Sequence, residues 1–270
     1  MKVITEKQDL TWLRWTTVRN SISIAGSFFK AMPVVGSRTY YKLSNFNVVE
    51  GIVGHECVNE IIADRLLTLL GIDHLSYTLI HADIMLNGKV HDTWLCSFDD
   101  FKKPGQSKIA LDMYYEIEHM EGESPLEFCV RQGWSDDLSK MLAAEYLMLN
   151  RDRHGANIEV LRAPATRSMT LTPLFDHGLS FVFNSYTENS LEKFDVLSDK
   201  RVQCFIGGCS TWDNLQLLPA AKLNKLRETD REFIFADLEL ALRKPWRDKI
   251  WDMIWRRWCR YEDLCNKRER

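Results

Sequence analysis

Two short β-like segments, at 158–162 and 168–172, constrain the fold of this chain more than any other feature. They read IEVLR and SMTLT and are joined by APATR, which predicts an antiparallel hairpin. Because a hairpin folds the chain back on itself, the residues that flank its two ends become neighbours. These residues are Asn157 before the first strand and Asp176 after the second. The sequence therefore predicts a polar site beside the hairpin.

The segment NRDRHGAN (150–157) adds further polar side chains at this end of the hairpin. Its Asp152 and Asn157 are spaced so that a carboxylate can face a reacting hydroxyl while a carboxamide oxygen faces a cation. The pattern Asp-Arg-His-x-x-Asn is expected by chance in on the order of one chain in a thousand. On the other side, Asp176 follows a buried-strand signature and precedes Gly178, which permits a sharp departure of the backbone.

The oxygens of Asn157 and Asp176 suit Mg²⁺, which uses few protein ligands and completes its octahedron with waters and phosphates. Taken singly, the polar residues have simpler interpretations. Asp152 could cap a turn, Asn157 could end a helix and Asp176 could be a solvated loop acid. Their occurrence together around one hairpin favours the metal site.

The pattern of predicted strands and helices divides the chain near residue 100. Before it, a helix is predicted from about 54 to 70, with Gly71 as a left-handed C-cap. Short β-like runs surround this helix, at 21–24, 38–43, 76–82 and 92–98.

The second half is predominantly helical. The stretch 136–149 has one apolar face with Ser135 as its N-cap, and 230–262 predicts one or two helices broken at Lys244–Pro245. We therefore predict an α+β protein with a small β-rich lobe (1–98), which contains one main helix, and a larger helical lobe (99–270).

Charge and composition exclude several classes of protein. Thirty-five Lys and Arg against 38 Asp and Glu argue against nucleic-acid binding through bulk charge. No apolar run approaches the roughly 20 residues of a membrane span, and the first residues lack a signal-peptide pattern. Seven scattered Cys indicate reduced thiols. We expect a cytoplasmic protein that does not bind membranes.

The order Asp-Arg-His-x-x-Asn, hairpin, Asp-x-Gly resembles the catalytic and metal-binding loops of the protein-kinase-like superfamily. The His variant is typical of HipA-type bacterial serine/threonine kinases and of phosphoinositide kinases. The segments ISIAGSFFKAMPVV, TYYKLS, NEIIADRLLTLLGI and DTWLCSFDDF are similar in order and spacing to HipA. This resemblance covers about residues 21–183 and implies a two-lobed protein-kinase-like fold that uses ATP and Mg²⁺.

The resemblance implies that Lys42 contacts the nucleotide phosphates and that Glu60 steadies this lysine. Without it, Lys42 would be interpreted as an exposed strand-edge lysine. Glu60 lies off the apolar stripe of its helix, so it could equally be a solvent-facing acid beside Glu56 and Asp64.

The resemblance also implies a nucleotide-covering loop, with Ser23 at a position where some HipA kinases autophosphorylate. Cys96 and Phe98 would contact adenine, although an ordinary buried strand explains them as well. The loop residues implied to bind ATP are Ala25, Gly26, Ser27 and Lys30.

In the second half, the resemblance implies that Asp152 is the catalytic residue that accepts the proton of the acceptor hydroxyl. Asn157 and Asp176 would bind ATP and hold the metal ions. His154 would be a loop organiser or a phosphate neighbour, and a neutral buried histidine bonded to the backbone is the commoner case for such a residue.

The activity implied is that of a HipA-like serine/threonine protein kinase, with the role of toxin in a toxin–antitoxin pair open. Its protein substrate could be an aminoacyl-tRNA synthetase or another translation factor, and its partner an antitoxin or a separately encoded N-terminal subdomain. The alternatives are a lipid or small-molecule kinase of the same superfamily and an inactive kinase-fold binding protein.

The C-terminal segment 243–270 is rich in Trp and in Lys and Arg, and Trp251, Trp255 and Trp258 fall at helical intervals. We expect an amphipathic helix that closes the helical lobe with its arginines at the edge. A surface for nucleic acid, an acidic partner or a membrane is the alternative.

Overall fold

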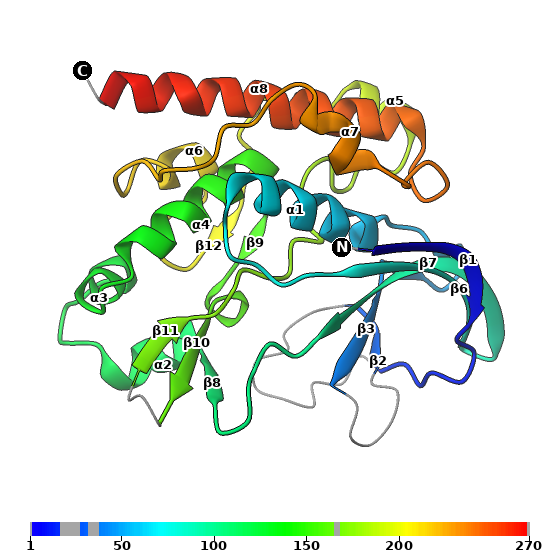
Figure 1. The fold of residues 1–270 in the computed structure, drawn as a ribbon, viewed down its shortest axis with the longest axis horizontal. Helices are drawn as coiled ribbons and strands as arrows, with labels where there is room; N and C mark the ends of the chain where they lie inside the picture. Colours follow the sequence, from blue (N-terminus) through cyan, green and yellow to red (C-terminus); the bar gives the residue numbers. More distant parts are fainter. Residues whose placement is uncertain (1, 17–27, 32–37, 165–167, 269–270) are drawn as a thin grey trace.

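A five-stranded sheet forms the β-rich lobe in the computed structural model, which describes residues 2–16, 28–31, 38–164 and 168–268 (Figure 1). Its strand order is β1-β6-β7-β3-β2, with β1 parallel to β6 and the other pairs antiparallel. The expected strands at 38–43, 76–82 and 92–98 are confirmed, whereas 21–24 lies outside the described residues. The strands are β1 (Lys2–Asp9), β2 (Lys30–Ala31), β3 (Thr39–Leu43), β6 (Thr78–Leu86) and β7 (Lys89–Asp99).

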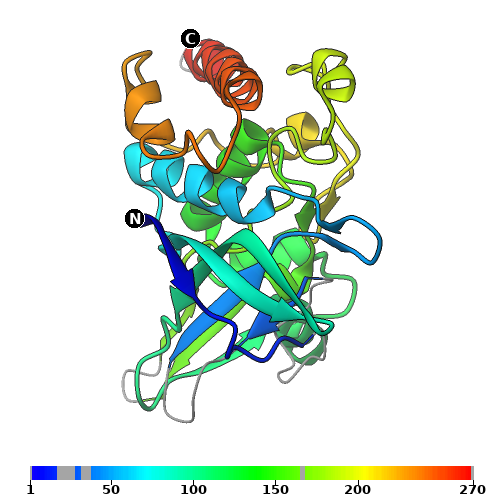
Figure 2. The same ribbon diagram turned by 90° about the vertical axis from the view of Figure 1, so that its right-hand side faces the viewer.

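Helix α1 (Glu56–Leu70) lies between this sheet and the helices of the other lobe (Figures 1 and 2). It ends at Gly71, whose φ of 71° is the left-handed C-cap conformation predicted from the sequence. Because the sheet covers one side of α1 and α7 (Asp230–Phe235) covers another, the helix is buried almost all round, including its acidic residues.

Helix α4 (Ser135–Met148) confirms the apolar helix predicted over 136–149, but the predicted N-cap is wrong. Trp134 occupies the N-cap position, and Ser135 is the first helical residue, whose carbonyl oxygen accepts a hydrogen bond from Ser139. The other short helices of this lobe are α2 (Leu111–Glu118), α3 (Pro125–Arg131), α5 (Glu188–Glu192) and α6 (Thr211–Asn214).

The predicted hairpin is confirmed as β10 (Glu159–Ala163) paired antiparallel with β11 (Ser168–Leu171). A third strand, β8 (Ser107–Ala110), pairs with the other edge of β10. Two smaller pairs complete the strands. They are β4 (Phe46–Asn47) with β5 (Gly51–Ile52), and β9 (Asp152–Arg153) with β12 (Gln203–Cys204).

Helix α8 (Lys244–Arg268) begins at the predicted break and extends beyond the predicted end at 262. Pro245 is its second residue, and the backbone N–H groups of the first helical turn have no partner within the helix, so the missing N–H of proline removes no hydrogen bond. The helix closes the lobe as expected, with Trp246, Met253 and Trp258 buried. The expectation that its arginines lie at the edge is wrong for Arg257, which is 1% exposed.

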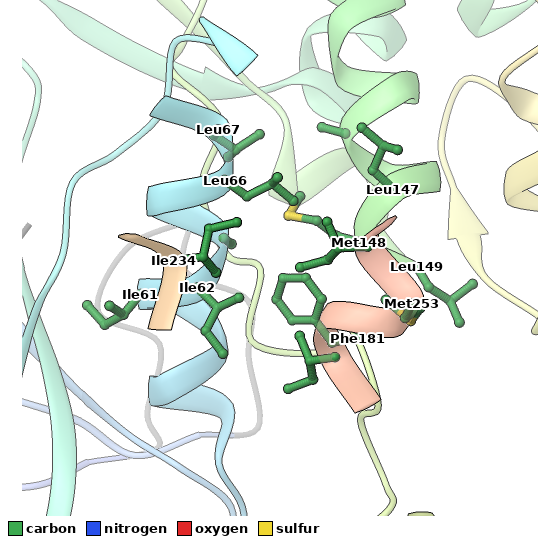
Figure 3. Packing of buried hydrophobic residues seen from close by; sticks show 14 of the residues in the cluster. Ile61, Ile62, Leu66, Leu67, Leu147, Met148, Leu149, Phe181, Ile234 and Met253 are labelled. Atoms are coloured by element: carbon green, nitrogen blue, oxygen red, sulfur yellow. The ribbon is translucent and has the colours of Figure 1, made fainter. Parts of the chain in front are cut away.

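The main hydrophobic core joins α1, α4 and α8, so that both lobes share one packed interior (Figure 3). Ile62 and Leu66 of α1 face Met148 at the end of α4, with Phe181 between these elements. This packing fixes α1, and with it the side chains that α1 directs toward the sheet. No helix in the described part of the chain is long and apolar enough to cross a membrane.

Candidate active site

Lys42 occupies an interior strand of the sheet and is 3% exposed. Its strand β3 lies between β2 and β7, so the interpretation of Lys42 as an exposed edge lysine is wrong. Its Nζ lies 2.7 Å from Oε1 of Glu60 and 2.6 Å from Oδ1 of Asp176. One ammonium group therefore bridges carboxylates from α1 and from the segment after β11.

Glu60 is fully buried, so the interpretation of this residue as a solvent-facing acid is also wrong. Its second oxygen, Oε2, accepts a hydrogen bond of 2.8 Å from the backbone N–H of His177. Glu60 thus holds both Lys42 and the residue that follows Asp176. Burial raises the pKa of Glu60, although the adjacent ammonium group opposes this shift.

Asp176 has a φ of 59°, a left-handed conformation that is strained for a residue with a Cβ. Its backbone N–H donates to the hydroxyl of Tyr77 at 3.3 Å. Burial alone would raise the pKa of Asp176, but the ammonium groups of Lys42 and Lys30 outweigh it and lower this pKa. The carboxylate is therefore held ionised beside two cations.

Gly178 does not supply the backbone turn that the sequence suggested, because the left-handed residue is Asp176. Gly178 instead provides space. A Cβ at this position would lie 3.2 Å from Cβ of Glu56 and 3.3 Å from Nζ of Lys42. The glycine thus allows the chain after Asp176 to pass close to the bridging lysine.

Asp152 and Asn157 are joined through the backbone. The side-chain Nδ2 of Asn157 donates to the carbonyl oxygen of Asp152 at 2.8 Å, which directs the amide nitrogen into the loop. Partial burial, with Asp176 nearby, raises the pKa of Asp152 although His154 opposes this shift. A carboxylate with a raised pKa is better suited to accept a proton.

Arg153 connects the two loops of the site and was missed as a functional residue from the sequence. It is 1% exposed, and its NH1 donates to the carbonyl oxygens of Asn157 at 2.6 Å and Phe175 at 2.8 Å. Its other nitrogens donate to Oε1 of Glu145. The signal was its place inside the Asp-Arg-His pattern, between two residues that were assigned roles.

His154 is bonded to the backbone of its own loop, which agrees with its expected role as a loop organiser. Its Nδ1 accepts a hydrogen bond from the backbone N–H of Ala156 at 3.2 Å. The ring is not buried, since 29% of the side chain is exposed, and Nε2 lies 3.6 Å from Oδ1 of Asp152. The partly exposed histidine therefore lies beside the carboxylate of Asp152.

A cavity of about 180 Å³ adjoins Lys42 and Asp176. Phe98 lines it and packs against Tyr40 and Tyr77, with ring centroids 5.6 and 5.4 Å apart. Cys96 does not line the cavity and is buried against the helix side, where its neighbour is Cys57. Of the two residues assigned to adenine, the structure brings only Phe98 to the cavity.

Polar residues from several elements line the same cavity. Lys30 on β2 lies opposite Lys42 in the strand register, and its partial burial lowers its pKa. Asn157 and Asp176 line it as well, as the hairpin argument required. The proposed loop residues Ala25, Gly26 and Ser27, together with Ser23, lie outside the described residues.

The donor set of Asn157 and Asp176 fits Mg²⁺. Because the Nδ2 of Asn157 is bonded to the backbone, its Oδ1 is the atom that would face a cation. The carboxylate of Asp176 adds a second hard oxygen on the same cavity wall. Two protein oxygens are typical of magnesium sites that are completed by phosphates and waters.

Comparison with known proteins identifies the fold. No family model and no curated protein matches the chain. The crystal structure of the Helicobacter pylori proinflammatory kinase CtkA is similar over 97% of this chain and 98% of that one, with a TM-score of 0.59 and 14% identity. A Shewanella oneidensis MR-1 HipA structure, solved with HipB and operator DNA, aligns with 93% of this chain and 59% of that one, at 15% identity and a TM-score of 0.43. The protein therefore has the two-lobed, protein-kinase-like α+β fold expected from its sequence.

Proposed function

We propose that this protein is an ATP- and Mg²⁺-dependent phosphotransferase that acts on serine or threonine residues of other proteins. The observation that carries the proposal is the bridge from Lys42 to Glu60 and Asp176 beside an aromatic cavity. A buried ammonium group between two carboxylates, facing a cavity lined by flat rings, suits a nucleotide whose phosphates approach the lysine. The kinase-like fold supports the same activity.

In this proposal, the residues of the site act mainly by positioning and electrostatics. Lys42 orients the phosphates. The oxygen of the acceptor hydroxyl attacks the γ-phosphorus, and Asp152 accepts the proton of this hydroxyl. The bond from this phosphorus to the bridging β–γ oxygen then breaks, and ADP leaves with the electron pair. Mg²⁺ held by Asn157 and Asp176 would neutralise charge on the phosphate oxygens.

The test is the intact mass of the protein and of candidate acceptors after incubation with Mg-ATP. The wild type should add about 80 Da per phosphate to itself or to an acceptor. Asp152→Ala and Asp176→Ala should abolish this gain. Asp252→Ala, at an exposed position of α8, is the matched control and should retain it.

The choice of acceptors separates the alternatives. Proteins of translation, including aminoacyl-tRNA synthetases, are the first class to try, since the sequence resemblance implies them. Phosphorylation of phosphoinositides or small molecules, but of no protein, would favour the lipid or small-molecule kinase. Binding of ATP without transfer to any acceptor would overturn the proposed activity and favour an inactive kinase-fold binding protein.

A further inference from the structure

Glu159 is a buried carboxylate on the wall of the proposed nucleotide cavity. It is the first residue of β10, two positions after Asn157, and it is 1% exposed. Nζ of Lys108 lies 3.0 Å from its Oε2. This contact lacks hydrogen-bond geometry, and among the described residues neither carboxylate oxygen of Glu159 has a hydrogen-bond donor.

A buried carboxylate without a hydrogen-bond donor favours a ligand-binding role over a structural one. Buried polar groups in folded proteins are nearly all hydrogen-bonded, and a charged group left without donors is costly. The carboxylates of Glu60 and Glu145, at similar burial, each accept hydrogen bonds from named donors. Glu159 differs from them in having only the nearby charge of Lys108.

The chemistry of ATP limits what this carboxylate could bind. An ionised carboxylate only accepts hydrogen bonds, and the donors on ATP are the adenine amino group and the two ribose hydroxyls. Asn157 ends a 3-10 turn and β10 begins at Glu159. Because two residues of chain span at most about 7 Å, Glu159 lies near Asn157 and hence near the proposed phosphate end. The ribose hydroxyls lie between the base and the phosphates, whereas the amino group lies on the far edge of the base.

We propose that Glu159 accepts hydrogen bonds from the ribose hydroxyls and selects ribonucleotides over deoxyribonucleotides. This inference rests on the nucleotide binding proposed above. Lys108, on the adjacent strand β8, places its ammonium group 3.0 Å from the carboxylate and itself packs over the ring of Phe101 at 5.3 Å. Both of these residues also line the cavity, so they form one wall with Glu159.

The test measures the affinity of the 270-residue chain for Mg-ATP, Mg-2′-deoxy-ATP and Mg-3′-deoxy-ATP by calorimetry. In the wild type, at least one deoxy analogue should bind about 10-fold or more weakly than ATP, because a hydrogen bond to a charged acceptor is lost. In Glu159→Leu, which keeps a side chain of similar size, all three nucleotides should bind equally. Glu228→Leu, at an exposed position, should retain the wild-type preference.

The outcomes separate this inference from the proposed function. Equal binding of all three nucleotides to the wild type would overturn the role of Glu159 and leave ATP binding intact. A preference for ATP that persists in Glu159→Leu would do the same. Failure of the wild type to bind ATP would overturn both proposals. A purely structural Lys108–Glu159 pair would change the melting temperature without changing the preference, so this measurement accompanies the affinities.

Discussion

Nζ of Lys42 lies 2.6 Å from Oδ1 of Asp176, although 134 positions separate the two residues in the chain. The contact joins an interior strand of the sheet to the segment that follows the hairpin of the helical lobe. Glu60 shares the same ammonium group, so the lysine neutralises two carboxylates at once. Lys42 is therefore the cation that Glu60 and Asp176 share.

Lys42→Met should reduce phosphoryl transfer and also destabilise the fold. We expect kcat to fall roughly 10²–10³-fold, as on removal of one preorganised electrostatic group. The free energy of unfolding should fall by roughly 3 kcal/mol, because two carboxylates lose their cation. Urea denaturation measures the second effect, and adding Glu60→Gln should restore part of the stability but none of the activity.

The matched control for this experiment is Lys89→Met, at an exposed end of β7. It should change the free energy of unfolding by no more than about 0.5 kcal/mol. Equal losses in Lys42→Met and Lys89→Met would contradict the structural role of the bridge.

Asp152→Asn should retain nucleotide binding but lose transfer. As a general base, this carboxylate should contribute about 10²–10⁴-fold to kcat. Burial raises its pKa above the ordinary value of 3.8, and it must be deprotonated to accept a proton. The kcat of the wild type should therefore rise with pH through this pKa and then level off, and the residual kcat of the variant should lack this rise. A variant with wild-type kcat would remove Asp152 from the reaction.

Gly178→Ala should impair activity more than stability. The added methyl group would lie 3.3 Å from Nζ of Lys42, so the lysine must shift relative to Asp176. We expect kcat to fall about 10-fold, because displacing a positioning group by a fraction of an ångström raises the activation free energy. Gly208→Ala is the control, since its Cβ would have only Asn214 at 3.8 Å. Equal kcat values for the two variants would show that the space beside Lys42 is not needed.

His177→Phe should stabilise the protein in mild acid. Burial holds the pKa of His177 well below 6.5, whereas the unfolded chain has the ordinary value. The unfolded state therefore binds an extra proton below pH 6.5, and wild-type stability that is complete above this pH is lost as the pH falls. The phenylalanine variant should gain up to about 1.4 kcal/mol relative to the wild type per pH unit below 6.5. A difference that is constant between pH 7.5 and 5.5 would contradict this expectation.

The elements that local pattern determines could be predicted from the sequence. The hairpin at β10 and β11 and the end of α1 at Gly71 follow from turn residues and periodicity within a few positions. The hairpin in turn predicted that Asn157 and Asp176 meet, and they line one cavity. Topology could carry this inference because antiparallel pairing of β10 with β11 brings the outer ends of the two strands together.

The features that distant segments determine could not be predicted. The burial of Glu60 depends on cover from the other lobe, and nothing in the pattern of its own helix indicates it. Strand β1 was missed because all of its residues are exposed or half-buried and it therefore carries little apolar alternation. The unsatisfied carboxylate of Glu159 likewise appears only when the strands on both sides are in place.

Arg257 shows the same dependence on distant segments and allows a direct comparison with its neighbour on α8. Its guanidinium donates to the carbonyl oxygens of Val196, Tyr146 and Ser198 at 2.8–3.0 Å. Arg257→Met removes a donor from three carbonyl oxygens, and that of Tyr146 keeps the backbone N–H of Leu149 at 3.3 Å. The substitution should lower the free energy of unfolding by roughly 3 kcal/mol. Arg257→Lys should also be destabilising, since one ammonium group cannot reproduce the planar fork.

Arg256 is the matched control, because it precedes Arg257 in the chain and is exposed, with its Nε 3.8 Å from Oδ1 of Asp252. Arg256→Met should change the free energy of unfolding by no more than about 0.5 kcal/mol. Chemical denaturation of the two variants in parallel measures the difference. Because both substitutions remove one positive charge from the same helix, a larger loss for Arg257 reflects its buried contacts. These are the three carbonyl bonds and the packing of the guanidinium over the ring of Tyr146 at 5.1 Å. Equal losses would refute this account.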